Sequence, residues 1–134
     1  MNNLAGTIIA IDTDGNLSLT DIDVTPDLRM SALIVETPEH CPWLKTGHQV
    51  KVLFKETEVS IARNLSGQIS LRNRFPATIT KIRSEGMLAE ITLDSTGHPV
   101  VSIITSRSAQ RMDLQTGDQV EWLVKANEVS LTGN

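Results

Sequence analysis

Three polar residues in the middle of the chain have the side chains that a site for a small anion uses. Ser70, Arg72 and Asn73 supply a hydroxyl, a guanidinium and a carboxamide within four residues. They lie just before a stretch, 75–82, whose β-branched and apolar residues in near alternation predict a strand. Polar donors at the mouth of a strand suit a small anion. The alternative interpretation is a polar linker that runs into a strand.

A second set of polar residues precedes the last apolar stretch of the chain. Lys125-Ala126-Asn127 lies there, and Lys55-Glu56-Thr57 occupies the corresponding place in the first half. Met87 and Leu88 follow a turn at Gly86. A tetrahedral oxyanion needs hydroxyl, amide and ammonium donors that converge on one site. Two such segments that meet across the sequence copies or across subunits would provide these donors. The alternative interpretation is that the lysines lie on the surface and the serines cap turns.

No catalytic constellation is present in the sequence. His40, His48 and His98 lack the spacing of metal ligands and lie near Pro or Gly turns, so we expect no direct coordination of a metal by side chains. A Gly-x-Ser-x-Gly elbow, a phosphate loop and a dinucleotide fingerprint are all missing. We therefore predict a binding protein rather than an enzyme, with Cys41 as a partly buried structural thiol.

Composition narrows the class of partner. The 134 residues are 40% hydrophobic and 21% charged, typical of a soluble globular protein. A net charge of −4 and an aromatic content of 3% disfavour nucleic-acid binding, which needs basic surfaces or aromatic platforms for bases. The sequence contains neither an apolar run of about 20 residues nor a signal peptide. One cysteine cannot form an internal disulfide, so we expect a cytoplasmic protein without membrane insertion.

The elements that position the polar residues come from a tandem duplication. Residues 44–50 and 58–61 recur at 114–120 and 128–131, always 70 positions later. Upstream, Thr7-Ile8 matches Thr78-Ile79 and Ser31 matches Ser102, 71 positions later. This change of offset predicts one inserted or deleted residue between a strand and a helix. The predicted domains are residues 1–66 and 67–134.

Each copy predicts the same order of elements. Strands are expected at 4–12, 17–24, 29–36, 49–54 and 58–62 of the first copy. A short helix is expected from Thr37 and Pro38 in the first copy and over 107–114 in the second. The fold class is therefore all-β: two tandem five-stranded β-barrels of the oligonucleotide/oligosaccharide-binding (OB) type, each with one short helix. Barrels this small need to pack together or to oligomerise.

The second copy resembles a known family through three segments. Ser70-Leu71-Arg72-Asn73-x-Phe75 is similar to the Ser-x-Arg-Asn-x-(Leu/Phe) opening of the Mop domain, the TOBE-type molybdate-binding barrel of molbindins. Residues 114–118 and 125–129 resemble its Leu-x-x-Gly-Asp and Lys-Ala-Ser-x-Val segments. Residues 86–91 resemble its Gly-Ala-Val-Asn-Ala-Glu-Val turn, one residue shorter. The first copy matches more weakly, through the internal repeat.

The resemblance implies a ligand and a set of contacts. The ligand would be molybdate or tungstate, and its contacts would come from Ser70, Arg72, Asn73, Met87, Leu88, Lys125, Ala126 and Asn127. Lys55 and Thr57 form a second candidate site. Asn127 stands where the family has Ser, and Pro76 enters the first strand. Because the first copy begins Met1-Asn2-Asn3 without Ser-x-Arg-Asn, we expect Lys125→Ala to weaken binding more than Lys55→Ala.

Two variants of the family suggest different roles. One is a stand-alone tandem protein that stores molybdate, usually as a trimer of tandems; the other is the C-terminal regulatory part of the ATP-hydrolysing subunit of molybdate importers, a dimer. Residues 59–63 and Ala77 resemble the importer variant. The resemblance thus implies molybdenum storage, homeostasis or regulation of import. The alternative function is a protein-interaction or dimerisation barrel without a small ligand.

Overall fold

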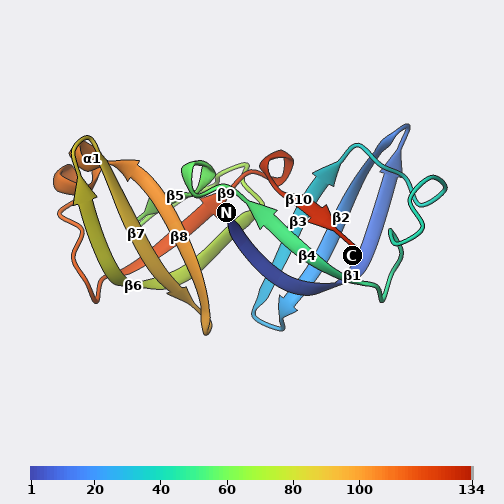
Figure 1. Cartoon of the computed structure of the whole chain (residues 1–134), viewed down its shortest axis with the longest axis horizontal. Coiled ribbons are helices and arrows are strands. Elements are labelled where there is room, and N and C mark those ends of the chain that lie inside the picture. Colours follow the sequence, from blue (N-terminus) through green and yellow to red (C-terminus); the bar gives the residue numbers. More distant parts are fainter. Residues whose placement is uncertain (134) are drawn as a thin grey trace. The chain divides into compact units, whose positions relative to one another are not determined.

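Ten β-strands make up most of the chain in this computed structural model, which describes residues 1–133 (Figure 1). The chain divides into two compact units. Unit 1 contains residues 1–54 together with the described residues from Lys125 onward, and unit 2 contains residues 55–124. The prediction of an all-β fold with two five-stranded sheets is confirmed.

The sheet of unit 1 has the strand order β10-β4-β1-β2-β3, and every neighbouring pair is antiparallel. Its strands are β1 (Asn2–Asp14), β2 (Leu17–Thr25), β3 (Leu28–Ile34), β4 (Gln49–Phe54) and β10 (Ser130–Thr132). A 3₁₀ turn, η2 (Ala126–Glu128), precedes β10 and lies against β3.

The sheet of unit 2 has the equivalent order β5-β9-β6-β7-β8, again antiparallel throughout. Its strands are β5 (Ser60–Ala62), β6 (Asn73–Glu85), β7 (Leu88–Ser95), β8 (His98–Thr105) and β9 (Gln119–Val124). It also contains the 3₁₀ turn η1 (Glu56–Glu58), which lies against β8, and the helix α1 (Ser106–Arg111).

The last strand of each sequence copy completes the sheet of the other copy. β10 ends the second copy but pairs with β4, where Ser130 lies opposite Leu53. β5 ends the first copy but pairs with β9, where Ser60 lies opposite Leu123 (Figure 1). The units therefore differ from the predicted domains 1–66 and 67–134. Repeat boundaries mark where a sequence was duplicated, whereas backbone pairing decides which strands share a sheet.

The cores follow the alternation of the strands. In unit 1, Ile8, Ile22 and Val52 are fully buried. In unit 2, Trp122 is fully buried, lies 5.1 Å from Phe75 between ring centroids, and donates its Nε1–H to Ser95 Oγ at 2.9 Å. The indole thus has the hydrogen-bond partner that a buried Trp needs. Trp122 therefore belongs to the core of unit 2.

The predicted helix of the first copy does not form. At 37–41 the chain forms a single turn, in which the carbonyl of Thr37 accepts His40 N–H at 3.1 Å and Cys41 N–H at 3.0 Å. Pro42 stops it, because proline has no N–H and disfavours the helical conformation in the preceding residue. In the second copy, α1 begins after Thr105, whose hydroxyl accepts from Ser108 N–H at 3.1 Å, and ends at Arg111. No helix within residues 1–133 has the length and apolar character needed to cross a membrane.

The strand register corrects one predicted match between the copies. Ala32 pairs with Thr20, and Ser102 pairs with Ile91, which corresponds to Thr20. Ser102 is therefore the counterpart of Ala32 and not of Ser31. The offset changes from 71 to 70 at an irregularity between Asp23 and Thr25 in β2, which β7 lacks. The extra residue of the first copy therefore lies in a β-bulge of β2. It does not lie between a strand and a helix, as the sequence predicted.

Candidate functional site

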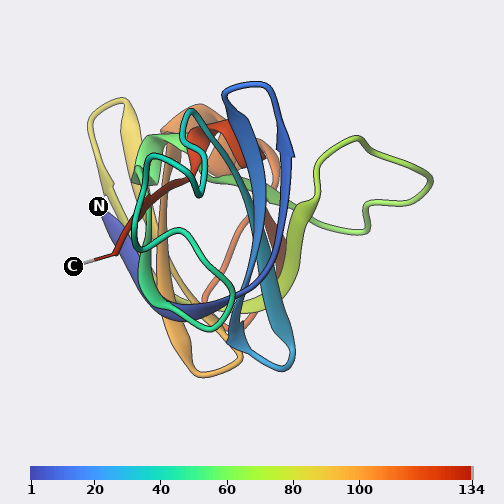
Figure 2. The same ribbon diagram turned by 90° about the vertical axis from the view of Figure 1, so that its right-hand side faces the viewer.

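The predicted segment Ser70–Asn73 spans the end of a loop and the start of a strand. The loop joins β5 to β6 and extends away from the strands (Figure 2). Ser70 and Arg72 lie on it and are exposed, whereas Asn73 is the first residue of β6 and is fully buried. A hydroxyl and a guanidinium are thus presented to solvent, next to a carboxamide held inside unit 2.

Arg74 anchors this loop to the sheet. Its Nε donates to Glu121 Oε2 at 2.6 Å and its Nη2 to Glu121 Oε1 at 3.0 Å, a two-pronged pair. The same Nη2 donates to the carbonyl of Leu65 at 2.9 Å. Donating these hydrogen bonds to Glu121 raises the pKa of the Arg74 guanidinium above its ordinary value. A cavity of about 580 Å³ lies along the loop and is lined by Gly67, Gln68, Ile69, Ser70, Leu71 and Arg74.

The two lysine segments have the same local structure. Lys55 precedes η1 and Lys125 precedes η2, and both residues are extended and exposed. The carbonyl of Lys55 accepts Glu58 N–H at 3.0 Å, and that of Lys125 accepts Glu128 N–H at 2.9 Å. In each case a tight turn fixes the backbone while the ammonium group stays in solvent.

Unit 2 brings the first copy's lysine segment close to the Ser-x-Arg-Asn segment. Asn73 pairs with Val124, and Ser60 pairs with Leu123, so β5 and β6 flank the same end of β9. Neighbouring strands are about 4.8 Å apart, which separates β5 from β6 by roughly 10 Å. Lys55 and Thr57, just before β5, therefore lie at the same end of unit 2 as Ser70 and Arg72.

Unit 1 contains the other lysine segment. This segment, Lys125 to Asn127, precedes β10. Ser130 of β10 pairs with Leu53, and Asn2 of β1 pairs with Phe54. The segment therefore lies at the end of unit 1 where β4 ends and β1 begins. Asn2 is buried, like its counterpart Asn73. The first copy thus keeps the asparagine of the motif, which the sequence prediction missed. The signal that identifies this asparagine is the repeat offset of 71 residues, which relates Asn2 to Asn73.

Met87 and Leu88 lie in the hairpin between β6 and β7. Met87 is 85% exposed, and its carbonyl accepts Ser106 N–H at 2.8 Å. Ser106 Oγ also donates to the carbonyl of Gly86 at 3.0 Å. Within unit 2, this hairpin and Asn73 are at opposite ends of the 13-residue strand β6. Unit 2 therefore does not bring Met87 and Leu88 together with Ser70 and Asn73.

The histidines and the cysteine are separate from these segments. His40 is exposed, with Nδ1 at 3.2 Å from Thr37 Oγ1, and Cys41 is buried. Within residues 1–133, no group of three or more His, Cys, Asp or Glu residues is arranged to hold a metal ion. The donors available for a ligand are hydroxyl, amide, guanidinium and ammonium groups.

Comparison with protein families matches a model of the TOBE domain to residues 69–131. This part of the chain is a TOBE domain. The TOBE domain begins one residue before Ser70 and ends within β10, so it includes both the Ser-x-Arg-Asn segment and the Lys125 segment. It crosses from unit 2 into unit 1 at Lys125.

Curated relatives share this sequence over part of the chain. The molybdenum import ATP-binding protein ModC of Brucella abortus is 41% identical over 87 residues, which are 64% of this chain and 24% of ModC. The molybdenum-pterin-binding protein MopA of Rhodobacter capsulatus is 38% identical over 69 residues, 51% of this chain and 26% of MopA. The chain therefore spans about a quarter of the length of these relatives.

A solved structure has the same fold over nearly the whole chain. The cytoplasmic molybdate-binding protein ModG, with molybdate bound, matches with a TM-score of 0.93 at 22% identity. The match covers 99% of this chain and 96% of ModG. The fold of this chain, with its two five-stranded antiparallel sheets, is therefore a known fold.

Proposed function

We propose that this protein binds a tetrahedral oxyanion, molybdate or tungstate. The observation that carries the proposal is the identity of 41% and 38% to two relatives whose names both concern molybdenum. The fold shared with ModG, a molybdate-binding protein, supports the same ligand. The exposed hydroxyl, guanidinium and ammonium groups at one end of unit 2 are suitable donors for such an anion.

We assign the principal binding groups to Ser70, Arg72 and Asn73 together with Lys55 and Thr57, because unit 2 contains all five. Lys125, Ala126 and Asn127, with Asn2, would form a second site in unit 1 that lacks the serine and arginine. Met87 and Leu88 would contribute backbone groups only if another copy of the chain supplied them. This assignment reverses the order of the two lysines expected from the motif alone.

The proposed role is molybdenum storage and homeostasis, or regulation of molybdate import, in the cytoplasm. Similarity to a quarter of an import ATP-binding protein favours the regulation of import. Storage is favoured by the resemblance to stand-alone tandem proteins. A protein-interaction barrel without a small ligand is the competing function. Both families of relatives support the ligand more directly than they support either role.

Calorimetric titration tests the ligand. Molybdate and tungstate should release heat with saturable binding, and sulfate and phosphate should bind more weakly. Absence of heat with all four anions would favour the protein-interaction barrel. Heat with sulfate but not with molybdate would reject the assignment of the ligand.

Single lysine variants test the assignment of the site. Lys55→Ala should weaken molybdate binding by roughly tenfold or more, because charge-assisted hydrogen bonds contribute about 1.5–3 kcal/mol. Lys125→Ala should cost less, and Lys81→Ala, an exposed lysine of unit 2 outside the site, should have no effect. If Lys125→Ala lowers the molybdate affinity more than Lys55→Ala does, the site has the arrangement that the motif predicts, with Lys125 as the principal lysine.

We also propose self-association, as a trimer or a dimer. Each unit is a small barrel, and a domain of this size gains only marginal stability from its own buried core. Sedimentation velocity at micromolar concentration should give a mass above one chain. A monomer that binds molybdate with full affinity would refute a site shared between subunits.

A further inference from the structure

A cavity of about 740 Å³ opens on the surface of unit 1, away from both lysine segments. It is lined by residues of β1, of β2, of the start of β4 and by Gly133. Its lining combines small residues with polar ones; the polar side chains belong to Thr7, Asp23, His48, Gln49 and Lys51. No residue of the proposed oxyanion site lines it.

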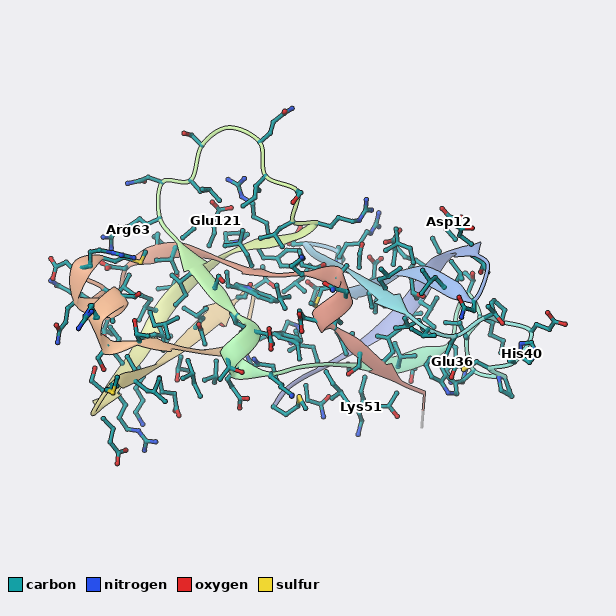
Figure 3. All side chains as sticks on the ribbon, turned by 90° about the horizontal axis from the view of Figure 1, so that it is seen from above. Asp12, Glu36, His40, Lys51, Arg63 and Glu121 are labelled. Carbon is teal, nitrogen blue, oxygen red and sulfur yellow. The ribbon has the colours of Figure 1, made fainter. Side chains whose placement is uncertain are left out.

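Two basic side chains dominate this cavity. The His48 ring lies with Nε2 at 3.1 Å from the carbonyl of Gly133. Lys51 is exposed on β4, points away from the ribbon (Figure 3), and forms no ion pair within residues 1–133. Asp23 is the one carboxylate in the lining, and Arg29 neutralises it through a hydrogen bond of 2.7 Å from Nε. Among the described residues, the lining therefore has an excess of positive charge.

At the equivalent positions of unit 2 the charged side chains form ion pairs with one another. Residues 48, 51 and 133 correspond to Asp118, Glu121 and Arg63, 70 positions away. Arg63 donates to Asp118 Oδ2 at 3.1 Å and also to the carbonyl of Met112. Arg74 neutralises Glu121, with Nε at 2.6 Å from Oε2. The two copies thus differ here: unit 2 has two paired acids, and unit 1 has two basic residues that form no ion pair within residues 1–133.

Gly133 keeps the cavity of unit 1 open. A Cβ placed on this residue would lie 2.2 Å from the indole of Trp43, so the backbone packs directly against the ring. A side chain like that of Arg63 has no room at this position. The opening therefore follows from the packing of Gly133 on Trp43, together with the lack of an arginine.

We propose that this cavity binds a small organic anion, through a phosphate or carboxylate group held by Lys51 and His48. Thr7 and Gln49 offer a hydroxyl and a carboxamide to the same group or its carbon skeleton. The volume falls within the range of about 300–1,000 Å³ typical of sites for small organic molecules. A single tetrahedral oxyanion would leave most of it unfilled. The site is independent of the proposed oxyanion site.

Titrations of the full chain followed by NMR test this proposal. Glycerol 3-phosphate and citrate serve as the organic probes, and inorganic phosphate and molybdate as the inorganic ones. The organic anions should shift the ring resonances of His48 and saturate. Glycerol 3-phosphate alone would assign a phosphate group, and citrate alone a carboxylate group. Lys51→Glu and His48→Asp, which install the residues of unit 2, should each weaken this binding by roughly tenfold or more.

Controls separate this site from the oxyanion site. Lys45→Glu changes an exposed lysine of unit 1 that does not line the cavity, and it should leave organic-anion binding unchanged. Lys51→Glu should leave the heat of molybdate binding unchanged, and Ser70→Ala should leave the His48 shifts unchanged. The proposal fails if neither organic anion shifts His48 at millimolar concentration. It also fails if Lys45→Glu and Lys51→Glu weaken binding equally, or if inorganic phosphate binds as tightly as the organic probes.

Discussion

At the scale of single residues, Ser102 shows how a side chain holds the exchanged segment in unit 2. Its Oγ donates to the carbonyl of Val59 at 2.6 Å, and both residues are buried. Val59 connects η1 to β5, so this bond fixes the segment that follows Lys55 and Thr57. The serine thus positions the candidate ligand groups without contacting them.

Ser102→Ala should destabilise unit 2 by about 1–3 kcal/mol, because the buried carbonyl of Val59 would lose its hydrogen bond. Urea unfolding followed by tryptophan fluorescence, which reports Trp122 of unit 2 and Trp43 of unit 1, measures this change. Ser130→Ala is a suitable control, since that exposed hydroxyl makes only a 3.4 Å bond to Leu53, and its cost should stay within about 0.5 kcal/mol. Equal costs for the two variants would show that the Ser102 bond is unimportant.

At the scale of elements, the bulge in β2 brings two strands of unit 1 unusually close. Thr7 of β1 pairs with Asp23, directly beside the bulge. A Cβ on Gly6 would lie 2.5 Å from Ile22 Cγ2 and 2.9 Å from the carbonyl oxygen of Asp23. The counterpart of Gly6 in β6 is Ala77, in the copy that lacks this bulge. The glycine therefore accommodates the extra residue of the first copy.

Gly6→Ala should destabilise unit 1 by about 1–3 kcal/mol, because overpacking against backbone is not relieved by rotating a side chain. The lower backbone entropy of alanine in the unfolded chain offsets only about 0.4–1 kcal/mol of this cost. Urea denaturation should show an earlier transition for unit 1. An unchanged or later transition would mean that the strands separate easily at the bulge.

At the scale of the whole molecule, the exchange of β5 and β10 makes each unit depend on both sequence copies. β10 contributes three residues to the ladder with β4, and the neighbouring Val129 is buried. Val59 has the equivalent place beside β5 in unit 2. A fragment cut at the repeat boundary would therefore carry an unpaired strand edge and an empty place in its core.

Fragments of the chain test this dependence. Residues 55–124, which form unit 2, should fold cooperatively, whereas residues 67–134 should not, because they lack η1 and β5. Circular dichroism during thermal unfolding and amide hydrogen exchange distinguish these outcomes. The reverse result, with 67–134 folded and 55–124 unfolded, would mean that β10 can replace β5 within its own copy.

The sequence by itself determined the strands, the duplication and the candidate donors. Alternation of apolar residues predicted the strands, since a strand that buries one face repeats every two residues. The segment Ser70–Asn73 and the two lysine segments were visible as motifs. Local patterns also misjudged two features: the helix expected at Thr37, which Pro42 prevents, and the match of Ser31 to Ser102, which the bulge displaces.

Only the tertiary structure decided which copies of these segments lie together. Strands β5 and β10 have similar sequences and are almost equally suited to either sheet, so no local pattern identifies their partners. Their pairing depends on long-range hydrogen bonds and on the burial of Val59 and Val129. That pairing places Lys55, not Lys125, in the unit of Ser70. The cavity at His48 and Lys51 likewise exists because Gly133 returns from the far end of the chain to pack against Trp43.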